Sequence, residues 1–575
     1  MSKINQERRR FLTSALYTSI YGGLMYSGLG VPSLQRSSKA TPAQLNERVL
    51  IDLFLDGGPD MRHLIVPEYS TVQDSFGQKY WENRQRSHNL SAFGQTAQQR
   101  WNDDYYHITV GGNNWNGQVD YGSLNNGVTF GILKQAGWLI DMFRAGNVAM
   151  VFNAVGGTNR AHDLSSMMLH QGNVTIGLND TNQSGWGGRL ARSAGANCIA
   201  LTISPNAFTF GPLGSSANYD PNEIDNSDLV AIENSREIGL YEAIFEDDQF
   251  IFDSHWKDKM SRTGLSYYEA LKQKNLPEIY QKALQHEENV RKFGKLITSR
   301  LSTVDIPELI NALYDDLDID GQPHNPDPND PTQARRVLRS WDFGSQIRNL
   351  YDILAVSDLE THANTEFPGE FAGFSFSPRV FSMRYGGWDT HSQQRPYEQN
   401  GIILTDVENP EVNRGIENGF RDIFSGHTGS LYPSVSPMNL NALHCGFSAL
   451  WQSLSPASRN NIAIVASGEF GRQLRDNGDR GTDHGKGNLM MVISEQVNGG
   501  IYGDMFPSSE IVKYDEPVNR TPDITPLTEI DHIFSKVCDW VEPGSGDQVF
   551  PRLSGSYSGD SPIIEQAGML NALFS

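Results

Sequence analysis

The sequence contains few cysteines and fewer basic than acidic residues. Three cysteines among 575 residues, Cys198, Cys445 and Cys538, permit one disulfide bond at most, which excludes a disulfide framework. There are 46 Lys and Arg against 68 Asp and Glu, a formal net charge of −22 that disfavours binding to phosphate backbones and anionic membranes. We therefore expect no nucleic-acid partner.

The sequence also lacks internal repeats, and its composition is that of a folded protein. Hydrophobic residues make up 38%, and 55 Gly with 27 Pro indicate many loops between packed elements and argue against disorder. The length suffices for one large or two ordinary domains with a well-buried core.

Residues 1–40 differ from the rest of the chain. Arg8, Arg9 and Arg10 precede Phe11-Leu12 and an uncharged run rich in Gly, Ser and Tyr, which resembles a twin-arginine export signal with cleavage after Ala40. The resemblance implies export of the folded protein, often already loaded with metal, by the twin-arginine translocase, and a periplasmic or secreted bacterial location. The run is too polar for a convincing membrane-spanning helix. An uncleaved anchor and an ordinary amphipathic helix are the alternatives.

Short apolar runs ended by glycine-rich turns predict an α/β fold. Residues 48–60 predict a buried strand that ends at Asp56 and Asp60, and residues 137–172 predict a helix, a strand from about Val148 and a second helix. The alternation returns from 346, with strands predicted within 377–391 and 461–472. We therefore expect a doubly wound, mostly parallel sheet built from two parts, residues 41–200 and 346–575.

Residues 201–345 predict a mostly helical insertion or cap that is acidic and polar. Within it, four aspartates and Gly321 follow the D-x-D-x-D-G spacing of a calcium loop: Asp316, Asp318, Asp320 and Asp327. Pro323 and Pro326 depart from that pattern, because they stiffen a loop that must wrap around an ion. Structural Ca²⁺ and a solvated acidic loop are therefore both open.

Several chemically capable residues follow predicted strands. Hydrolysis at phosphorus or sulfur is assisted by metal ions held by carboxylates and imidazoles from several strand ends. The residues that fit this description are Asp56 or Asp60, His162, Asp389, His391, Glu469, Arg472, Asp483 and His484. Each also has a structural alternative, such as a helix cap for Asp389 or a Glu469–Arg472 pair, but their shared position favours a site.

Five stretches resemble the domain of unknown function 1501 (DUF1501) family: "LFLDGGPDMRHLIVP", "NRAHDLSSMMLHQG", "SGWGGRLA", "RYGGWDTHSQQ" and "ASGEFGRQLRDNGDRGTDHGKGNLMMVI". The resemblance covers about residues 48–200 and 346–545 and implies an alkaline phosphatase-like or sulfatase-like fold. It implies a divalent metal (Zn, Mn or Ca) bound by Asp389, His391, Asp483 and His484, with Asp60 or Asp56. We further expect His162 and Arg472 to contact an ester oxyanion, and Glu469 to orient a ligand or act as a base.

Three departures from the family pattern limit what the resemblance implies. Ala161 stands where the family usually has Ser, which leaves Thr158 as the candidate nucleophile at the junction between loop and helix. None of the cysteines begins the C-x-P-x-R or C-x-A-x-R sequence that sulfatases convert to formylglycine. A histidine ligand after His484 has no obvious counterpart, so one metal and two metals are both open.

The sequence therefore predicts an exported metal-dependent hydrolase of small or polymeric phosphate or sulfate esters. The alternative is a non-catalytic binding or assembly protein that retains the fold. The substrate, the identity of the metal and the oligomeric state are not specified by these patterns.

Overall fold

The computed structural model describes most of the chain outside the N-terminus and the central insertion. The described residues are 41–157, 160–173, 183–201, 205–216, 218–232, 235, 245–246, 249–250, 294, 296–312, 341–369, 371, 375–392, 394–395, 398–399, 402–403, 415–425, 446–516, 523–551 and 568–574. The predicted export signal at 1–40, the predicted calcium loop with Asp316, Asp318, Asp320 and Asp327, and the candidate nucleophile Thr158 lie outside them.

A mixed, mostly parallel sheet of ten strands forms the centre of the protein, which confirms the α/β class. In spatial order the strands are β10 (Leu229–Ala231), β7 (Asn197–Ala200), β13 (Pro378–Tyr385), β1 (Val49–Leu55), β16 (Ile462–Ser467), β17 (Asn488–Ile493), β6 (Val148–Val155), β18 (Gly500–Tyr502) and β4 (Val119–Asp120). The tenth strand, β19 (Thr528–Glu529), pairs in parallel with Ala154 and Val155 at the end of β6, beyond the residues that pair with β18. Strand β17 runs antiparallel to both of its neighbours, β16 and β6.

Both faces of the sheet are covered, which explains why its central strands read as continuous apolar runs. All seven residues of β1 are buried. Because successive side chains point to opposite faces, Ile51 and Leu53 join one hydrophobic cluster while Leu50 and Phe54 join another. The sheet is thus the middle layer between two separate cores.

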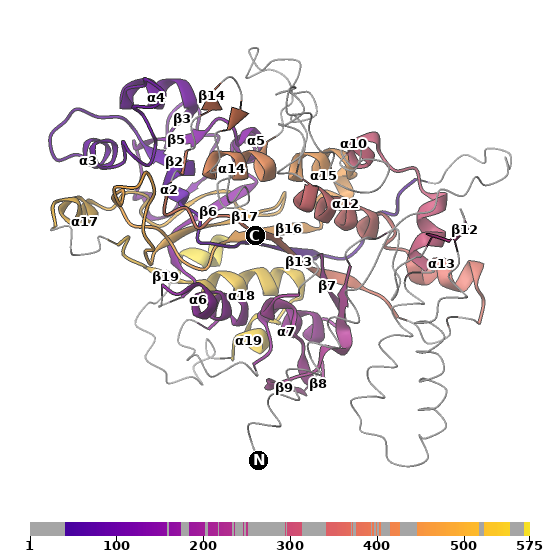
Figure 1. The fold of residues 1–575 in the computed structure, drawn as a ribbon. Helices are drawn as coiled ribbons and strands as arrows, with labels where there is room; N and C mark the ends of the chain where they lie inside the picture. Colours follow the sequence, from indigo (N-terminus) through magenta and orange to yellow (C-terminus); the bar gives the residue numbers. More distant parts are fainter. Residues whose placement is uncertain are drawn as a thin grey trace.

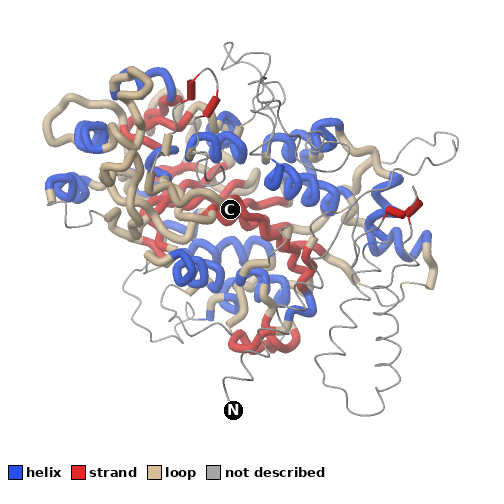
Figure 2. Tube along the Cα trace, viewed as in Figure 1, coloured by secondary structure: helices blue, strands red, loops and turns tan. Residues whose placement is uncertain are grey.

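Helices from distant parts of the chain form the two outer layers (Figures 1 and 2). On one face lie α5 (Gly137–Arg144), α12 (Trp341–Ala355), α14 (Ile416–Phe424) and α15 (Phe447–Ser453). On the other face lie α6 (His162–Gln171), α7 (Trp186–Ser193), α18 (Ile530–Val541) and α19 (Gly546–Val549). Phe143 and Leu350 pack in the first core, and Leu190 and Phe534 pack in the second.

Smaller elements surround this three-layer body. A three-stranded antiparallel sheet pairs β2 (Ile65–Pro67), β5 (Thr129–Leu133) and β3 (Tyr105–Thr109), beside α2 (Met61–Leu64), α3 (Phe76–Asn83) and α4 (Ala97–Asp104). The hairpin β8 (Pro212–Ser215) and β9 (Asn218–Ile224) and the edge strand β10 occur in the described beginning of the predicted insertion. Further short helices are α10 (Glu308–Ala312), α13 (Leu359–Glu366), α16 (Pro456–Arg459) and α17 (Ser508–Ile511). Across the described ranges, every helix is too short or too polar to span a bilayer.

The five central strands bring their polar loops to one edge of the sheet. Strands β13, β1, β16 and β6 end there, because they run in the same direction. Strand β17 runs the other way and begins there. The connection between β16 and β17, residues 468–487, therefore starts and finishes at the same edge.

Candidate metal centre

The candidate residues occupy loops at this edge of the sheet. His162 is the first residue of α6, which follows β6 in the chain, and Asp389 and His391 follow β13. Glu469 follows β16, and His484 precedes β17. The 468–487 loop folds back on itself, since Gln473 N donates to Asp483 O at 3.0 Å and Gly485 N donates to Gly471 O at 2.7 Å.

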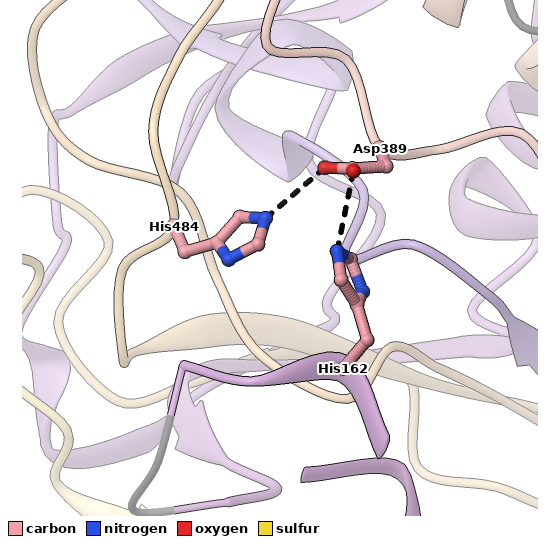
Figure 3. Close-up of side chains that lie close together, drawn as sticks. All are labelled: His162, Asp389 and His484. Atoms are coloured by element: carbon pink, nitrogen blue, oxygen red, sulfur yellow. Dashed lines mark hydrogen bonds and ion pairs between the residues drawn. The ribbon is translucent and has the colours of Figure 1, made fainter. Parts of the chain in front are cut away.

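Two imidazoles meet the carboxylate of Asp389. His484 Nε2 lies 3.0 Å from Asp389 Oδ1, and His162 Nε2 lies 3.2 Å from Asp389 Oδ2 (Figure 3). Ligand-type atoms of these three residues all lie within 4.8 Å of one another, a spacing at which one ion can contact them all. Sequence reasoning had expected His162 to contact an oxyanion, and its Nε2 faces the group of candidate metal ligands.

His391 adds a third imidazole to the group. Its Nε2 lies 2.8 Å from His484 Nε2 and 3.2 Å from Asp389 Oδ1. The side chains of His391 and Asp389 are 42% and 47% exposed, so the group opens to solvent on one side.

An oxygen atom holds the opposite nitrogen of each imidazole. His162 Nδ1 lies 2.9 Å from Glu469 Oε1, and His391 Nδ1 lies 3.1 Å from Asp483 Oδ1. His484 Nδ1 donates to the backbone oxygen of Arg160 at 2.7 Å, on the side of the ring away from Asp389 (Figure 3). A carbonyl or carboxylate oxygen only accepts, so each neutral ring carries its proton on Nδ1 and presents the Nε2 lone pair.

The two carboxylates behind the imidazoles are held in turn. Asn477 Nδ2 donates to Asp483 Oδ1 at 3.0 Å and to the His391 backbone oxygen at 2.7 Å. Glu469 is fully buried, and its Oε1 also accepts from the backbone N–H of Gly57 at 2.9 Å. The geometry thus makes Glu469 and Asp483 orienting groups for His162 and His391.

Arg472 lies beneath the group, fully buried. Its Nε donates to Gly58 O at 2.6 Å and its Nη1 donates to Thr482 O at 2.9 Å. Its Nη2 contacts Gly57 O, Trp388 O and Asp389 Oδ1 at 2.6, 2.9 and 2.9 Å. The described contacts of the guanidinium are with the loops that carry the site, and the expected contact with an ester oxyanion stays a prediction.

Charge interactions within the group lower the pKa of its Asp389 carboxylate and raise the pKa of two of its imidazoles. Burial alone would raise the pKa of Asp389, but His391, His484 and Arg472 hold it far below its usual range. The hydrogen bond to Glu469 raises the pKa of His162, and the contact with Asp389 raises that of His391. Clustered anionic and imidazole groups of this kind attract either protons or a metal cation.

Asp56 and Asp60 lie at the same sheet edge but have other partners. Arg384 Nε donates to Asp56 Oδ2 at 2.8 Å. Asp60 is buried and ion-paired with Arg84, and it lines a small cavity together with Arg472. The structure therefore does not bring either carboxylate into the group formed by His162, Asp389 and His484.

Sequence reasoning missed three contributors to the site. The Arg160 carbonyl and the Gly57 N–H act through the backbone, for which the residue type gives no signal. Asn477 lies in the stretch "RDNGDRGTDHG", and its amide, close in sequence to Asp483, was the one signal from which its role could have been predicted.

A second group of three residues has ligand-type atoms within 4.8 Å of one another: Glu529, Asp531 and His532. It lies at the start of α18.

Comparison with protein families gives one match. Residues 433–519 match the family described as "Protein of unknown function (DUF1501)", which confirms the resemblance over this range. The matched range includes β16, the 468–487 loop and β17, and so carries Glu469, Arg472, Asp483 and His484. No curated protein and no solved structure matches the chain.

Proposed function

We propose that this protein holds a divalent metal ion between three imidazole Nε2 atoms and the Asp389 carboxylate, and hydrolyses phosphate or sulfate esters there. The observation that carries the proposal is the shared orientation of His162, His391 and His484. Each ring is held at Nδ1 by an oxygen and turns Nε2 toward Asp389. We further propose that the fold is of the alkaline phosphatase-like type and that the protein is exported.

The close approach of the Nε2 atoms supports a cation. Two neutral imidazoles that present lone pairs to each other at 2.8 Å repel, and the Asp389 carboxylate adds negative charge beside them. A proton can relieve one such contact, whereas a divalent ion accepts lone pairs from several imidazoles and the carboxylate at once.

The donor set favours one class of ion. Three nitrogen ligands and one carboxylate suit Zn²⁺ and similar transition metals, whereas Ca²⁺ prefers a shell of oxygen atoms. Glu469 and Asp483 complete carboxylate–histidine pairs of the kind that raise the basicity of histidine ligands. Zinc is therefore the ion with which the proposal is first tested.

The protein side chains need only hold and orient the metal ligands in this proposal. A divalent ion supplies a Lewis acid that polarises an ester oxygen and lowers the pKa of water, so that a side-chain nucleophile is not needed. The chain itself orients the ligands through Glu469, Asp483 and Arg472 and leaves the group open to solvent. An anionic ester could approach from that open side.

Metal analysis of the purified protein tests the proposal. We expect about one zinc per chain, and we expect His391→Ala and His484→Ala to lower zinc affinity by at least tenfold. His107→Ala is the control, because His107 stacks on Trp101 in the small sheet. Absence of zinc from the parent, or equal zinc affinity in all variants, would contradict the site.

A panel of aryl phosphate, phosphodiester and aryl sulfate esters then tests hydrolysis. We expect turnover of at least one ester class by the zinc-loaded parent and its loss in His391→Ala. Zinc binding without turnover of any ester would favour the non-catalytic binding protein over the enzyme.

A further inference from the structure

A group of basic side chains lies behind the candidate metal centre. Arg160 forms an ion pair with Asp523 through its Nη2 atom. Burial raises the pKa of Asp523, and the positive charges of Arg160, Lys486 and Lys513 lower it. Lys513 Nζ also donates to the Asp523 backbone oxygen at 2.8 Å. We call Arg160, Lys486 and Lys513 the basic rim.

The basic rim is attached to the metal centre but lies outside its ligand atoms. The Arg160 carbonyl accepts from His484 Nδ1, which points away from Asp389 (Figure 3). Lys486 is exposed and lies two residues after His484 on the same loop. Gly487 N of that loop donates to the oxygen of Ile524, next to Asp523, at 3.2 Å. The basic rim therefore lies next to the Nδ1 atom of His484, on the side of the ring opposite Asp389.

The charge of the rim is unusual for this protein. The chain as a whole has a formal charge of −22, yet here Arg160 and Lys513 both contact Asp523, and Lys486 lies on the adjoining loop. Glu510, which also lies near Lys513, is buried and paired with Arg62. A local excess of positive charge, with Lys486 exposed to solvent, favours binding of anions.

We propose that the basic rim binds a second anionic group of the substrate, so that the ester hydrolysed carries at least two negatively charged groups. The proposal rests on the proposed function, because the first anionic group is the ester that contacts the metal. The rim lies beyond the His484 ring, so an anion at the rim is distinct from one at the ligand atoms. Such substrates include bisphosphorylated and multiply sulfated or carboxylated esters.

The ion pair between Arg160 and Asp523 gives the proposal a distinctive prediction. An incoming anion must share or replace Asp523 as the partner of Arg160. Removal of the charge on Asp523 should therefore strengthen binding of the second anionic group, and removal of the charge on Arg160 should weaken it. A purely structural ion pair would lose the same interaction in both variants.

Calorimetric titration with non-hydrolysable ligands provides the test. The probes are phenylphosphonate, 4-carboxyphenylphosphonate and its neutral amide, 4-carbamoylphenylphosphonate, each added to the zinc-loaded protein. We expect the parent to bind the carboxylated ligand about tenfold more tightly than the other two, as for a charge-assisted hydrogen bond. We expect Arg160→Gln to abolish this preference and Asp523→Asn to increase it several-fold.

Two controls separate this inference from the proposed function. Asp228→Asn, which breaks the ion pair of Asp228 with Arg192, should leave the preference unchanged. Arg160→Gln should retain zinc, because His484 contacts the Arg160 backbone and not its side chain. Zinc binding with equal affinity for all three ligands would overturn the inference alone. Absence of zinc from the parent would overturn the proposed function and this inference with it.

Discussion

Arg472 Nη2 lies 2.9 Å from Asp389 Oδ1, and the same guanidinium binds the backbone of the loops on either side of that carboxylate. Its acceptors include Gly57 O and Gly58 O after β1, Trp388 O after β13 and Thr482 O before β17. One buried cation therefore neutralises Asp389 and joins three loops that are far apart in the sequence. We infer that Arg472 is a positioning residue for the metal centre.

Arg472→Lys should destabilise the protein by about 3 kcal/mol, because an ammonium group cannot reach the carbonyls that a planar guanidinium joins. Denaturant unfolding of the metal-free protein measures this loss, and a zinc titration should show weaker binding as well. Arg459→Lys is the control, since the partly exposed pair of Arg459 with Glu495 should contribute less than about 1 kcal/mol. Equal losses in the two variants would contradict the positioning role.

Two substitutions at Asp483 distinguish an orienting residue from a metal ligand. Asp483→Asn retains an oxygen that accepts from His391 Nδ1 and Asn477, so zinc affinity should fall less than about tenfold. Asp483→Ala removes that acceptor and should lower the affinity by about 10- to 100-fold. If both substitutions abolish zinc binding equally, Asp483 is a direct ligand, as the sequence predicted.

Gly57→Ala should weaken both stability and zinc binding. Gly57 has φ +118°, and a Cβ atom there would lie 2.4 Å from the backbone nitrogen of Asp389. Relief of that clash requires movement of the loop that carries Asp389, the proposed metal ligand, at a cost of about 2–4 kcal/mol. Unfolding and zinc titration measure the two effects.

Gly94→Ala is the matched control, because Gly94 has φ +61° with open space around it. It should cost about 1 kcal/mol of backbone strain and leave zinc affinity unchanged. A similar loss of zinc affinity in Gly94→Ala would argue against a specific effect at Gly57.

Stability should depend on pH through His170. This imidazole is buried against Phe54, and burial, followed by the charge of Arg384, lowers its pKa to about 3. In the unfolded chain His170 binds a proton below about pH 6.5, whereas in the folded protein it stays neutral down to about pH 3. The free energy of unfolding therefore decreases as the pH falls from about 6.5 toward 3. The contribution to the slope is at most about 1.4 kcal/mol per pH unit.

His170→Gln should make the dependence of the unfolding free energy on pH shallower in that range. Urea unfolding at a series of pH values measures the slope, which is independent of any constant loss of stability in the variant. An unchanged slope would mean that His170 binds its proton equally in both states.

The strands were largely predictable from the sequence, because a strand buried on both faces must be apolar along its whole length. The runs that predicted strands correspond to β1, β6, β13 and β16. The direction of β17 was not predictable, since "NLMMVI" has the same local character in either direction. That direction depends on pairing with β16 and β6.

The sequence predicted which residues form the candidate site better than it predicted what each residue does there. The pattern identified Asp389, His391 and His484, which the structure brings together. It did not identify the partners of Asp56 and Asp60, because Arg384 lies 328 positions from Asp56 in the chain. Nor could residue type show that Glu469 and Asp483 face the Nδ1 atoms of two imidazoles, which depends on loop geometry.

The reversed direction of β17 makes the 468–487 loop a self-contained unit. Because the loop leaves β16 and re-enters the neighbouring strand, its replacement would leave the order of strands in the sheet unchanged. The loop carries one of the three imidazoles that face Asp389, the carboxylates behind the other two imidazoles and the buried guanidinium of Arg472. Chemistry at this edge could thus be diversified by exchange of one hairpin connection, provided that the new loop replaces the contacts of Arg472 with the loops after β1 and β13.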